Sequence, residues 1–271
     1  MNLLPAAAGG QPVSNSPAVS PDTAGRVTVL IDAVTKVFSA GAGSVTALED
    51  ISLTVRQGEF VCIVGASGCG KSTLLNLVAG LEAPTKGSVH RAGEPSFMFQ
   101  EAALFPWLSV EKNVELPLRL KGVPKGERRD RVGELLDMVQ LTAFAGRQPH
   151  ELSGGMRQRA ALARALAKDS EVLLMDEPFG ALDAMTRDIL HDELERIWDE
   201  TRRTILFVTH NVREAARLGD RIVLLTSRPG RVAQEFPVDL PRPRRLEDAD
   251  VAALAGRVTA RLREEVARHG Q

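Results

Sequence analysis

The sequence predicts an α/β fold in which a parallel-sheet core carries an N-terminal antiparallel β subdomain and an inserted α-helical subdomain. A short apolar run, Glu59–Val64, is followed by a glycine-rich loop and a helical pattern, the strand–loop–helix unit of such cores. Two later apolar runs end in polar residues at Asp176 and His210, as parallel strands do where ligands collect. Between the loop and these runs, the stretch from about residue 101 to residue 157 is helical in pattern and punctuated by prolines.

The composition is that of an ordinary globular protein, and it excludes several classes. With 271 residues, 44% of them hydrophobic and 25% charged, the chain is long enough for one large α/β domain. Its formal net charge of −1 provides no basic field, so nucleic acid is not an expected partner. The two cysteines lack disulfide or metal-ligand spacing, which favours a reducing cytoplasm. No apolar stretch approaches the ~20 residues that span a bilayer.

The chain is expected to divide into three parts. Residues 1–24 are rich in Ala, Gly, Pro and Ser and lack the regions of a signal peptide, which predicts a disordered tail. Residues 25–245 hold the core and its two subdomains. Residues 246–271 are expected to form a C-terminal amphipathic helix, whose apolar face packs on the body through Leu254, Val258, Leu262 and Val266.

The antiparallel subdomain is predicted from two strands at the start of the ordered chain. Arg26–Ile31 and Ile51–Val55 alternate in the manner of strands, and the loop Ser39–Ser44 separates them. Phe38 lies just before this loop. Its ring fits either a stack on a purine base or a packing contact within the sheet, and the sequence leaves both interpretations open.

The glycine-rich loop matches the pattern G-x-x-x-x-G-K-[ST], which predicts a P-loop that binds a nucleoside triphosphate. Its glycines let successive backbone N–H groups face inward, and the following helix adds positive charge at its N-terminus. Lys71 supplies a full charge to the β- and γ-phosphates, and the Ser72 hydroxyl suits Mg²⁺, which prefers oxygen ligands. Cys69 fits either a reactive thiol or a small residue that fills the loop. The expected phosphate-binding residues are Gly65, Ala66, Ser67, Gly68, Cys69, Gly70, Lys71, Ser72 and Thr73.

Two further strands lead from the loop to the helical stretch. They are expected at Gly87–His90 and Ser96–Phe99, and Gln100 follows the second of them, at the edge where ligands of an open α/β sheet bind. The stretch beyond Gln100 carries an apolar stripe at helical spacing, which predicts an inserted helical subdomain. The stripe consists of Val132, Leu135, Leu136 and Val139.

A second helix start carries residues suited to an anion. Ser153, Gly154 and Gly155 open a strong helical pattern, and the free N–H groups of a helix N-terminus attract negative charge. Taken alone, these residues equally fit an ordinary N-cap with a glycine turn, because serine is a common N-cap residue.

Polar residues also close the next two strands. Glu171–Asp176 is followed directly by Glu177, and because successive residues at a strand end face different sides, one carboxylate can serve a metal while the other faces a water. Two such carboxylates would be costly at a buried strand end without a cation or polar partners. Asp183 then opens a helix, and Thr204–His210 ends in a histidine at the same edge, a candidate contact for a γ-phosphate.

The last part of the body is expected to hold two short strands and a linker. The strands are Arg221–Thr226 and Arg231–Phe236. Pro241–Arg245 is a short basic run stiffened by proline, which predicts a solvated linker rather than a binding patch.

With these residues in place, the chain resembles the ATPase subunit of ATP-binding-cassette (ABC) transporters from about Val27 to Pro241. The resemblance implies a RecA-like P-loop core, and it identifies Ser153 as part of the family signature rather than only a helix cap. Phe38 falls where the family usually has an aromatic residue under adenine, and Gly180 stands where many relatives have serine. The motifs that carry the resemblance, in the family's order, are Gly65–Ser72, Gln100, Leu152–Gly155, Met175–Pro178 and His210.

The resemblance also implies a mechanism. Two copies would pair head to tail as a homodimer, so that each ATP lies between one P-loop and the Ser153–Gly155 tip of the other copy. Mg²⁺ would be held by Ser72, Gln100 and Asp176, and Asp183 would lie at the nucleotide. The catalytic residues implied are Lys71, Gln100, His210, which would contact the γ-phosphate, and Glu177, which would orient and deprotonate the attacking water.

A narrower resemblance is to the nitrate, sulfonate and taurine importer branch. It is carried by Phe99–Trp107, Arg228–Arg231 and Asp239–Arg244. It implies uptake of a small anionic solute through separate membrane permease subunits, which contact the chain near Ala102–Trp107. A solute-binding protein would act through the permease. The chain would then lie at the cytoplasmic face of the cell membrane as a peripheral subunit.

Two other functions are weighed against this one. A soluble ABC-type ATPase acting on nucleic acid or ribosomes usually has a long coiled-coil insertion or two cassettes, and this sequence shows neither repeat nor basic stripe. A nucleotide-dependent assembly factor that does not hydrolyse ATP is disfavoured by intact Glu177 and His210. The signature excludes a P-loop kinase.

Overall fold

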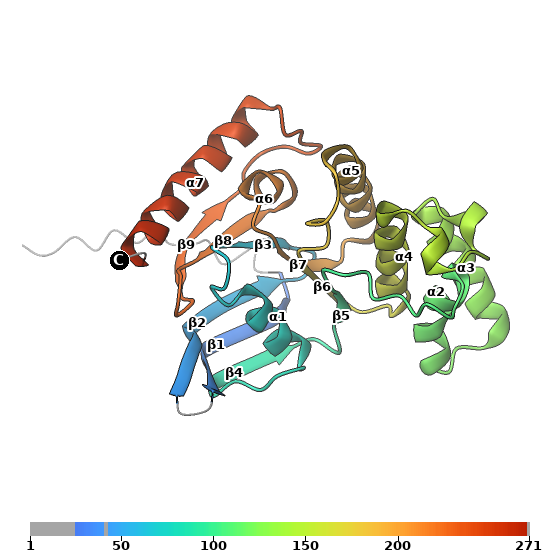
Figure 1. Cartoon of the computed structure of the whole chain (residues 1–271), viewed down its shortest axis with the longest axis horizontal. Helices are drawn as coiled ribbons and strands as arrows, with labels where there is room; N and C mark the ends of the chain where they lie inside the picture. The colour runs from blue at the N-terminus through green and yellow to red at the C-terminus, as the bar shows by residue number, and fades with distance from the viewer. Residues whose placement is uncertain (1–24, 41–42, 270–271) are drawn as a thin grey trace, which may run out of the picture.

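The computed structural model describes residues 25–40 and 43–269, arranged as two sheets covered by helices (Figure 1). The tail expected at residues 1–24 lies outside this range. A three-stranded antiparallel sheet has the order β2-β1-β4, and a six-stranded sheet has the order β5-β6-β7-β3-β8-β9. The strands are β1 (Val27–Ala40), β2 (Gly43–Arg56), β3 (Phe60–Val64), β4 (Lys86–Arg91), β5 (Ser96–Met98), β6 (Val172–Asp176), β7 (Thr204–Val208), β8 (Arg221–Leu225) and β9 (Val232–Pro237).

The helices surround the six-stranded sheet and extend it at one end. The green segment of Figure 1, which holds the stretch expected to be a helical subdomain, projects from this end of the sheet beside α4. The helices are α1 (Lys71–Ala79), α2 (Val110–Leu120), α3 (Lys125–Met138), α4 (Gly154–Ala167), α5 (Ala184–Thr201), α6 (Val212–Leu218) and α7 (Ala249–His269), with short 3-10 turns η2 (Thr142–Phe144) and η3 (Pro149–Glu151).

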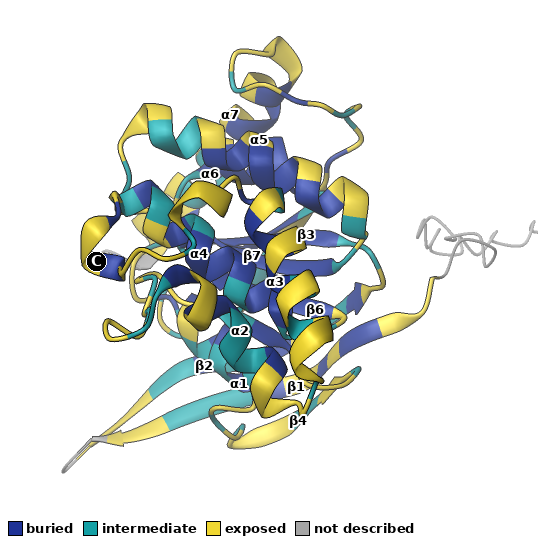
Figure 2. Ribbon diagram, turned by 90° about the vertical axis from the view of Figure 1, so that its right-hand side faces the viewer, coloured by how far each residue is buried: buried dark blue, intermediate teal, exposed yellow. Residues whose placement is uncertain are grey.

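The six-stranded sheet forms the centre of the core. Every residue of β3 and β7 is buried (Figure 2), as their apolar sequences, with Thr204 the one polar residue, predict for central parallel strands. The five strands from β5 to β8 run parallel, and β9 closes the edge antiparallel to β8. Because β3, β5, β6 and β7 point the same way, the residues that follow them meet at one edge of the sheet. The expected α/β core is confirmed.

The antiparallel sheet is larger than the sequence indicated. β1 and β2 pair along almost their whole length and run through the loop expected at Ser39–Ser44, down to Ala40 opposite Gly43. Several register shifts interrupt the ladder, and such bulges bend a ribbon without ending it. β4 adds a third strand on the other side of β1.

The C-terminal helix α7 packs on the body through only part of its predicted face. Leu254 and Val258 are buried in the main core and Leu262 is partly buried against it. Val266, by contrast, is 45% exposed. The apolar stripe therefore continues past the end of the surface that covers it.

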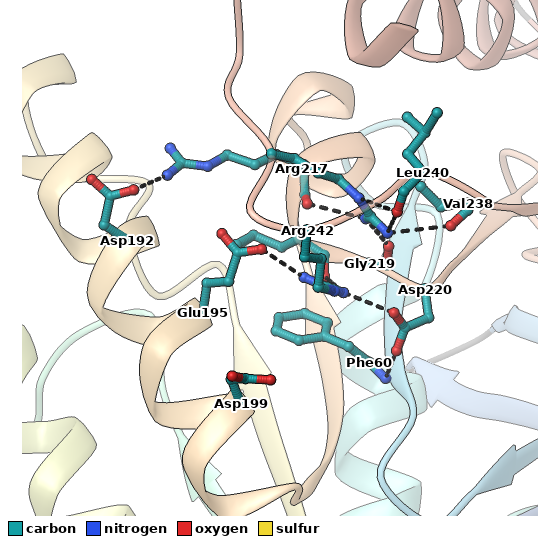
Figure 3. A network of polar contacts seen from close by, with 12 residues as sticks. Phe60, Asp192, Glu195, Asp199, Arg217, Gly219, Asp220, Val238, Leu240 and Arg242 are labelled. Atoms are coloured by element: carbon teal, nitrogen blue, oxygen red, sulfur yellow. Dashed lines mark hydrogen bonds and ion pairs between the residues drawn. The ribbon is translucent and has the colours of Figure 1, made fainter. Parts of the chain in front are cut away.

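The basic run Pro241–Arg245 is not the solvated linker that the sequence predicted. Arg244 is only 3% exposed, and its guanidinium donates hydrogen bonds to backbone carbonyls. Arg242 lies over the Trp198 ring, 4.4 Å from its centroid. Figure 3 shows that it also pairs with Glu195 and Asp220. The run therefore connects α5, α6 and the segment after β9 by hydrogen bonds and ion pairs. The carbonyls that accept from Arg244 are those of Arg217, Gly219, Val238 and Leu240.

Arg244→Met is expected to lower the free energy of unfolding by roughly 3 kcal/mol, since each buried carbonyl left without a donor costs about 1–3 kcal/mol before relaxation. Urea denaturation followed by circular dichroism measures the change. Arg245→Met is the matched control, because Arg245 is exposed in the same run and its loss should change stability by less than about 0.5 kcal/mol. Equal stability of the two variants would show that the Arg244 contacts contribute nothing net.

Candidate nucleotide site

The carboxyl ends of three parallel strands border one open cavity, and His210, after a fourth strand, adjoins it through its contact with Glu177. The loop that starts at Gly65 follows β3, Gln100 follows β5, Asp176 ends β6 and His210 follows β7. The cavity has a volume of about 410 Å³. Its lining residues are Ala47, Ser67, Gly68, Gly70, Lys71, Ser72, Thr73, Gln100, Asp176 and Glu177.

Lys71 is the cation at the floor of this cavity. It is the first residue of α1 and only 5% exposed. Its ammonium donates to the carbonyls of Gly65 and Ala66, at 3.0 and 3.1 Å, and lies 4.0 Å from Glu177 Oε1. A desolvated ammonium at a helix N-terminus is a strong attractor for phosphate.

A glycine at position 70 of the loop is required by close packing on β2. Gly70 has a φ of +99°, and a Cβ there would lie 2.6 Å from Leu48 Cδ2 and 2.9 Å from the Ala47 carbonyl oxygen. Cys69 is fully buried beside Lys71, and burial raises the pKa of its thiol. A buried thiol of raised pKa is inert, so Cys69 fills the loop rather than serving as a reactive group.

Asp176 and Glu177 point to different partners. Desolvation raises the pKa of the half-buried Asp176 carboxyl, a hydrogen bond with the Ser72 hydroxyl opposes the rise, and the charge of Glu177 adds to it. Glu177 adopts a φ of +44°, a left-handed conformation that is strained for a residue with a side chain. Its Oε2 lies 2.8 Å from His210 Nδ1. The carboxylate of Glu177 thus lies between the His210 ring and the Lys71 ammonium.

Gln100 joins the cavity to helix α4. Gln100 lines the cavity, and its backbone carbonyl accepts a hydrogen bond of 2.9 Å from Gln158 Nε2 on α4. Arg164, one turn and a half further along α4, donates to the carbonyls of Ala102 and Ala103. The segment after β5 is therefore held to the helix that begins at the signature residues.

A second group of expected site residues lies apart from the cavity. Ser153 caps α4, where its hydroxyl accepts from the Met156 N–H at 3.3 Å. Asp183 caps α5 and accepts from the backbone N–H and hydroxyl of Thr186, which lowers the pKa of its carboxyl. A Cβ on Gly155 would lie 2.5 Å from Thr186 Cγ2, so the two helix starts are in contact. Neither Ser153 nor Asp183 is among the described residues that line the cavity.

Phe38 likewise stays outside the lining. It is 37% exposed, and the Lys36 ammonium lies 4.8 Å from its ring centroid. Its strand β1 pairs with β2, which contributes Ala47 to the cavity wall. The ring is thus exposed on the ribbon that borders the cavity.

The turn between β8 and β9 also touches the P-loop, which the sequence did not indicate. A Cβ on Gly68 would lie 2.9 Å from Arg228 Nη2, and one on Gly230 would lie 2.2 Å from the Cys69 carbonyl oxygen. Arg228 is exposed, and no carboxylate of the described residues forms an ion pair with it. Sequence patterns linked Arg228–Arg231 only to a family branch, because nothing in them shows that a turn more than 150 residues away from the loop packs on it.

Comparison with known proteins agrees with this geometry. Residues 48–180 match the family described as ABC transporter. The nitrate import ATP-binding protein NrtD of Synechocystis sp. is 47% identical over 76% of this chain and 80% of its own length. The aliphatic sulfonates import ATP-binding protein SsuB of Bacillus licheniformis is 46% identical over 77% of this chain and 84% of its own length.

One solved structure is similar to this chain in both fold and sequence. The dimeric ATP-binding cassette MJ0796, in a post-hydrolysis state bound to ADP and Pi, superposes with a TM-score of 0.71. It is 36% identical, and the match covers 79% of this chain and all of that chain. Within the described residues, none of the helices is long and apolar enough to cross a membrane. The chain belongs to the ABC transporter family, as an ATP-binding subunit that hydrolyses ATP.

Proposed function

We propose that this chain energises the import of a small anionic solute, of the nitrate or sulfonate type, through a separate membrane permease. Two relatives named as nitrate and aliphatic sulfonate import proteins support the solute class and favour transport over an ATPase acting on nucleic acid or ribosomes. The observation that carries the enzymatic part is the placement of Glu177 between His210 and Lys71 at the mouth of the phosphate cavity.

The cavity residues fit the triphosphate of ATP with Mg²⁺. Lys71 and the loop amides would hold the phosphates, and the Ser72 hydroxyl, the Gln100 amide and the Asp176 carboxylate offer the oxygen donors that Mg²⁺ prefers. When bound there, the ion would neutralise charge on the β- and γ-phosphates. Phe38 would stack on the adenine from the ribbon that borders the cavity.

Glu177 would act as the general base. Its carboxylate is fixed on one side by His210 Nδ1, which leaves it aimed at the space above Lys71 where a γ-phosphate would end. A water in that space would be oriented and deprotonated by Glu177 as it attacks. His210 would both hold Glu177 and contact the γ-phosphate.

The second group of residues would complete the site of another copy. Ser153–Gly155 and Asp183 lie side by side at the starts of α4 and α5, outside their own chain's cavity. A head-to-tail homodimer would bring each of these tips onto the partner's nucleotide, and two-fold symmetry makes the exchange reciprocal. The dimeric state of the cassette MJ0796 supports this arrangement.

A permease would dock beside the Gln100 segment. A groove of about 580 Å³ lies there, lined by residues 100–104 and by α4 residues such as Arg157. Trp107, 70% exposed, and Phe105, whose backbone is held by Asn113, border this region with apolar surface. We propose that the subunit lies at the cytoplasmic face of the membrane, bound to its permease, and that a solute-binding protein acts through that permease.

Co-expression with candidate permeases, followed by co-purification and reconstitution into liposomes, tests the proposal. The expected result is uptake of nitrate or of an alkanesulfonate that depends on MgATP and on Glu177. Uptake of a cation or sugar instead would refute the solute class. Phosphate release stimulated by RNA or ribosomes, with no permease bound, would refute the transport function.

Arg228→Gln is expected to raise the KM for ATP about three- to tenfold at low salt, since one charge at short range near a protein surface contributes on the order of 1 kcal/mol or more. The reason is that the guanidinium adds positive potential at Gly68, on the phosphate loop. Steady-state hydrolysis over a range of ATP concentrations measures the effect. Arg231→Gln is the control, because that arginine belongs to the same turn but is paired with Glu49 at 2.7 Å. An equal KM for both variants would contradict a specific contribution from Arg228.

A further inference from the structure

His191 is a fully buried histidine on α5 that contacts both segments carrying the proposed catalytic pair. It is 0% exposed and lies outside the nucleotide cavity. A buried imidazole needs polar partners, since an unpaired ring nitrogen inside a protein is costly. The identity of these partners shows what the residue does.

On one side, His191 is linked to His210. His191 Nε2 lies 2.5 Å from Glu214 Oε1 on α6, and the other carboxylate oxygen of Glu214 accepts a hydrogen bond from the Thr209 hydroxyl. Thr209 directly precedes His210, and its hydroxyl oxygen accepts from the Asn211 N–H at 2.9 Å. The Thr209 hydroxyl therefore links the His210 turn to Glu214. Glu214 is in turn held by His191.

On the other side, His191 supports the turn of Glu177. Its ring packs edge-on against Phe179, with centroids 5.5 Å apart, and Phe179 in turn packs on Phe207 of β7 at 6.0 Å. Phe179 lies two residues after Glu177, inside the turn that the Gly180 N–H closes on the Glu177 carbonyl at 3.1 Å. This turn contains the strained left-handed Glu177, which persists only where its surroundings fix it.

The remaining faces of His191 are defined by α5 and α6. Its Nδ1 lies 3.5 Å from Arg217 Nη1 and 3.8 Å from Asp188 Oδ1. An arginine can only donate, so Nδ1 is placed to accept from Arg217 and Nε2 to donate to Glu214. Arg217 is itself engaged by Asp192, which fixes it from the solvent side.

We propose that His191 is a positioning residue that sets the Glu177–His210 contact, by holding the His210 turn through Glu214 and Thr209 and the Glu177 turn through Phe179. The inference rests on the roles proposed above for Glu177 and His210. General-base catalysis needs the carboxylate within hydrogen-bond reach of its water, and a displacement of about 1 Å can cost on the order of 100-fold in rate.

Two substitutions separate the proposed role from simple packing. His191→Phe keeps a ring against Phe179 but cannot donate to Glu214, whereas His191→Gln places an amide N–H within similar reach of Glu214. The expected result is that His191→Phe lowers kcat about tenfold or more with the KM for ATP changed less than about twofold, and that His191→Gln retains most of kcat.

A spectroscopic readout tests the contact without using activity. The chain has five histidines, so ¹⁵N-histidine labelling gives few ring signals, and His210→Ala assigns those of His210. We expect the His210 ring shifts of His191→Gln to match the wild-type protein, and those of His191→Phe to move toward a freely solvated imidazole. Thr209→Val removes the hydroxyl that donates to Glu214, another link in the same series of hydrogen bonds, and should give the same shift and loss of kcat. It replaces His191→Phe should that variant not fold.

Leu194→Ala is the stability-matched control, because Leu194 is fully buried on the same helix. It should lower the unfolding temperature while leaving kcat at 25 °C unchanged. Unperturbed His210 signals in both His191→Phe and Thr209→Val would overturn the proposal, as would an equal loss of kcat in Leu194→Ala. Retained turnover in Glu177→Gln or His210→Ala would instead refute the proposed catalytic roles. The His210 ring signals test the positioning role independently of turnover.

Discussion

Glu177→Gln is expected to bind MgATP with unchanged affinity and to hydrolyse it at least about 100 times more slowly, because a positioned general base contributes roughly 10²–10⁴ to the rate. The amide has the shape of the carboxylate, so the loop, Lys71 and Ser72 keep their geometry, but it cannot accept the proton of the attacking water. Nucleotide affinity from a fluorescent ATP analogue and phosphate release under saturating ATP measure the two parts separately.

The control for this variant is Glu171→Gln. Glu171 lies just before the same strand, β6, and forms an exposed ion pair with Arg26 at 3.0 Å, so its loss should leave both affinity and turnover unchanged. Steady-state hydrolysis at the wild-type rate in Glu177→Gln would remove Glu177 from the role of base. Loss of ATP binding in that variant would show that the carboxylate, poised 4.0 Å from the Lys71 ammonium, instead maintains the cradle.

The central strands and the P-loop were predictable because local patterns specify them. Glu59–Val64, Glu171–Asp176 and Thr204–His210 each contain a run of four or five apolar residues, and in a parallel sheet they become β3, β6 and β7 within one or two residues of the expected ends. Strand polarity then places the residues after them at one edge, so that Glu177 and His210 meet although they lie 33 residues apart in the sequence.

What the sequence could not predict depends on tertiary contacts. Helix α6 has only seven residues, too few for an apolar period to be visible, and it is held by its Asn211 cap and by packing. Arg244 is a charge that composition alone assigns to solvent, yet the four backbone carbonyls that accept its hydrogen bonds make burial favourable. The partners of His191 come from three separate segments, and no spacing in the sequence reveals such a cluster.

The separation of the expected nucleotide residues into two groups has a consequence for assembly. In the described structure, the P-loop residues Ser67, Gly68 and Gly70–Thr73 line the cavity, whereas Ser153–Gly155 and Asp183 are not among the residues that line it. A helix N-terminus with serine and two glycines exposes N–H groups that attract an anion, and Ser153 is exposed to receive one. If these groups serve the same reaction, a second copy has to bring them together.

Ser153→Arg is therefore expected to reduce hydrolysis to below about a tenth of the wild-type rate, while each chain still binds ATP. The reason is that loss of several positioned donors at a transition state costs on the order of 10²-fold in rate. A long cationic side chain would block the approach of the tip to a partner nucleotide without touching its own cavity. Ser109→Arg is the matched control, because Ser109 caps α2 through the same contact, a hydroxyl that accepts from the Lys112 N–H at 3.3 Å. Loss of either cap costs about 1 kcal/mol of stability, so only the site of the change differs.

Mixing two inactive variants tests whether the site is shared. Ser153→Arg keeps an intact cradle and Lys71→Ala keeps an intact tip, so a mixed dimer contains one complete site, and an equal mixture should recover up to about a quarter of wild-type hydrolysis. Glu177→Gln with MgATP, analysed by light scattering, should form a dimer that Ser153→Arg in the same background does not. Wild-type turnover in Ser153→Arg would mean that one chain encloses its nucleotide by itself, and the reciprocal site would have to be abandoned.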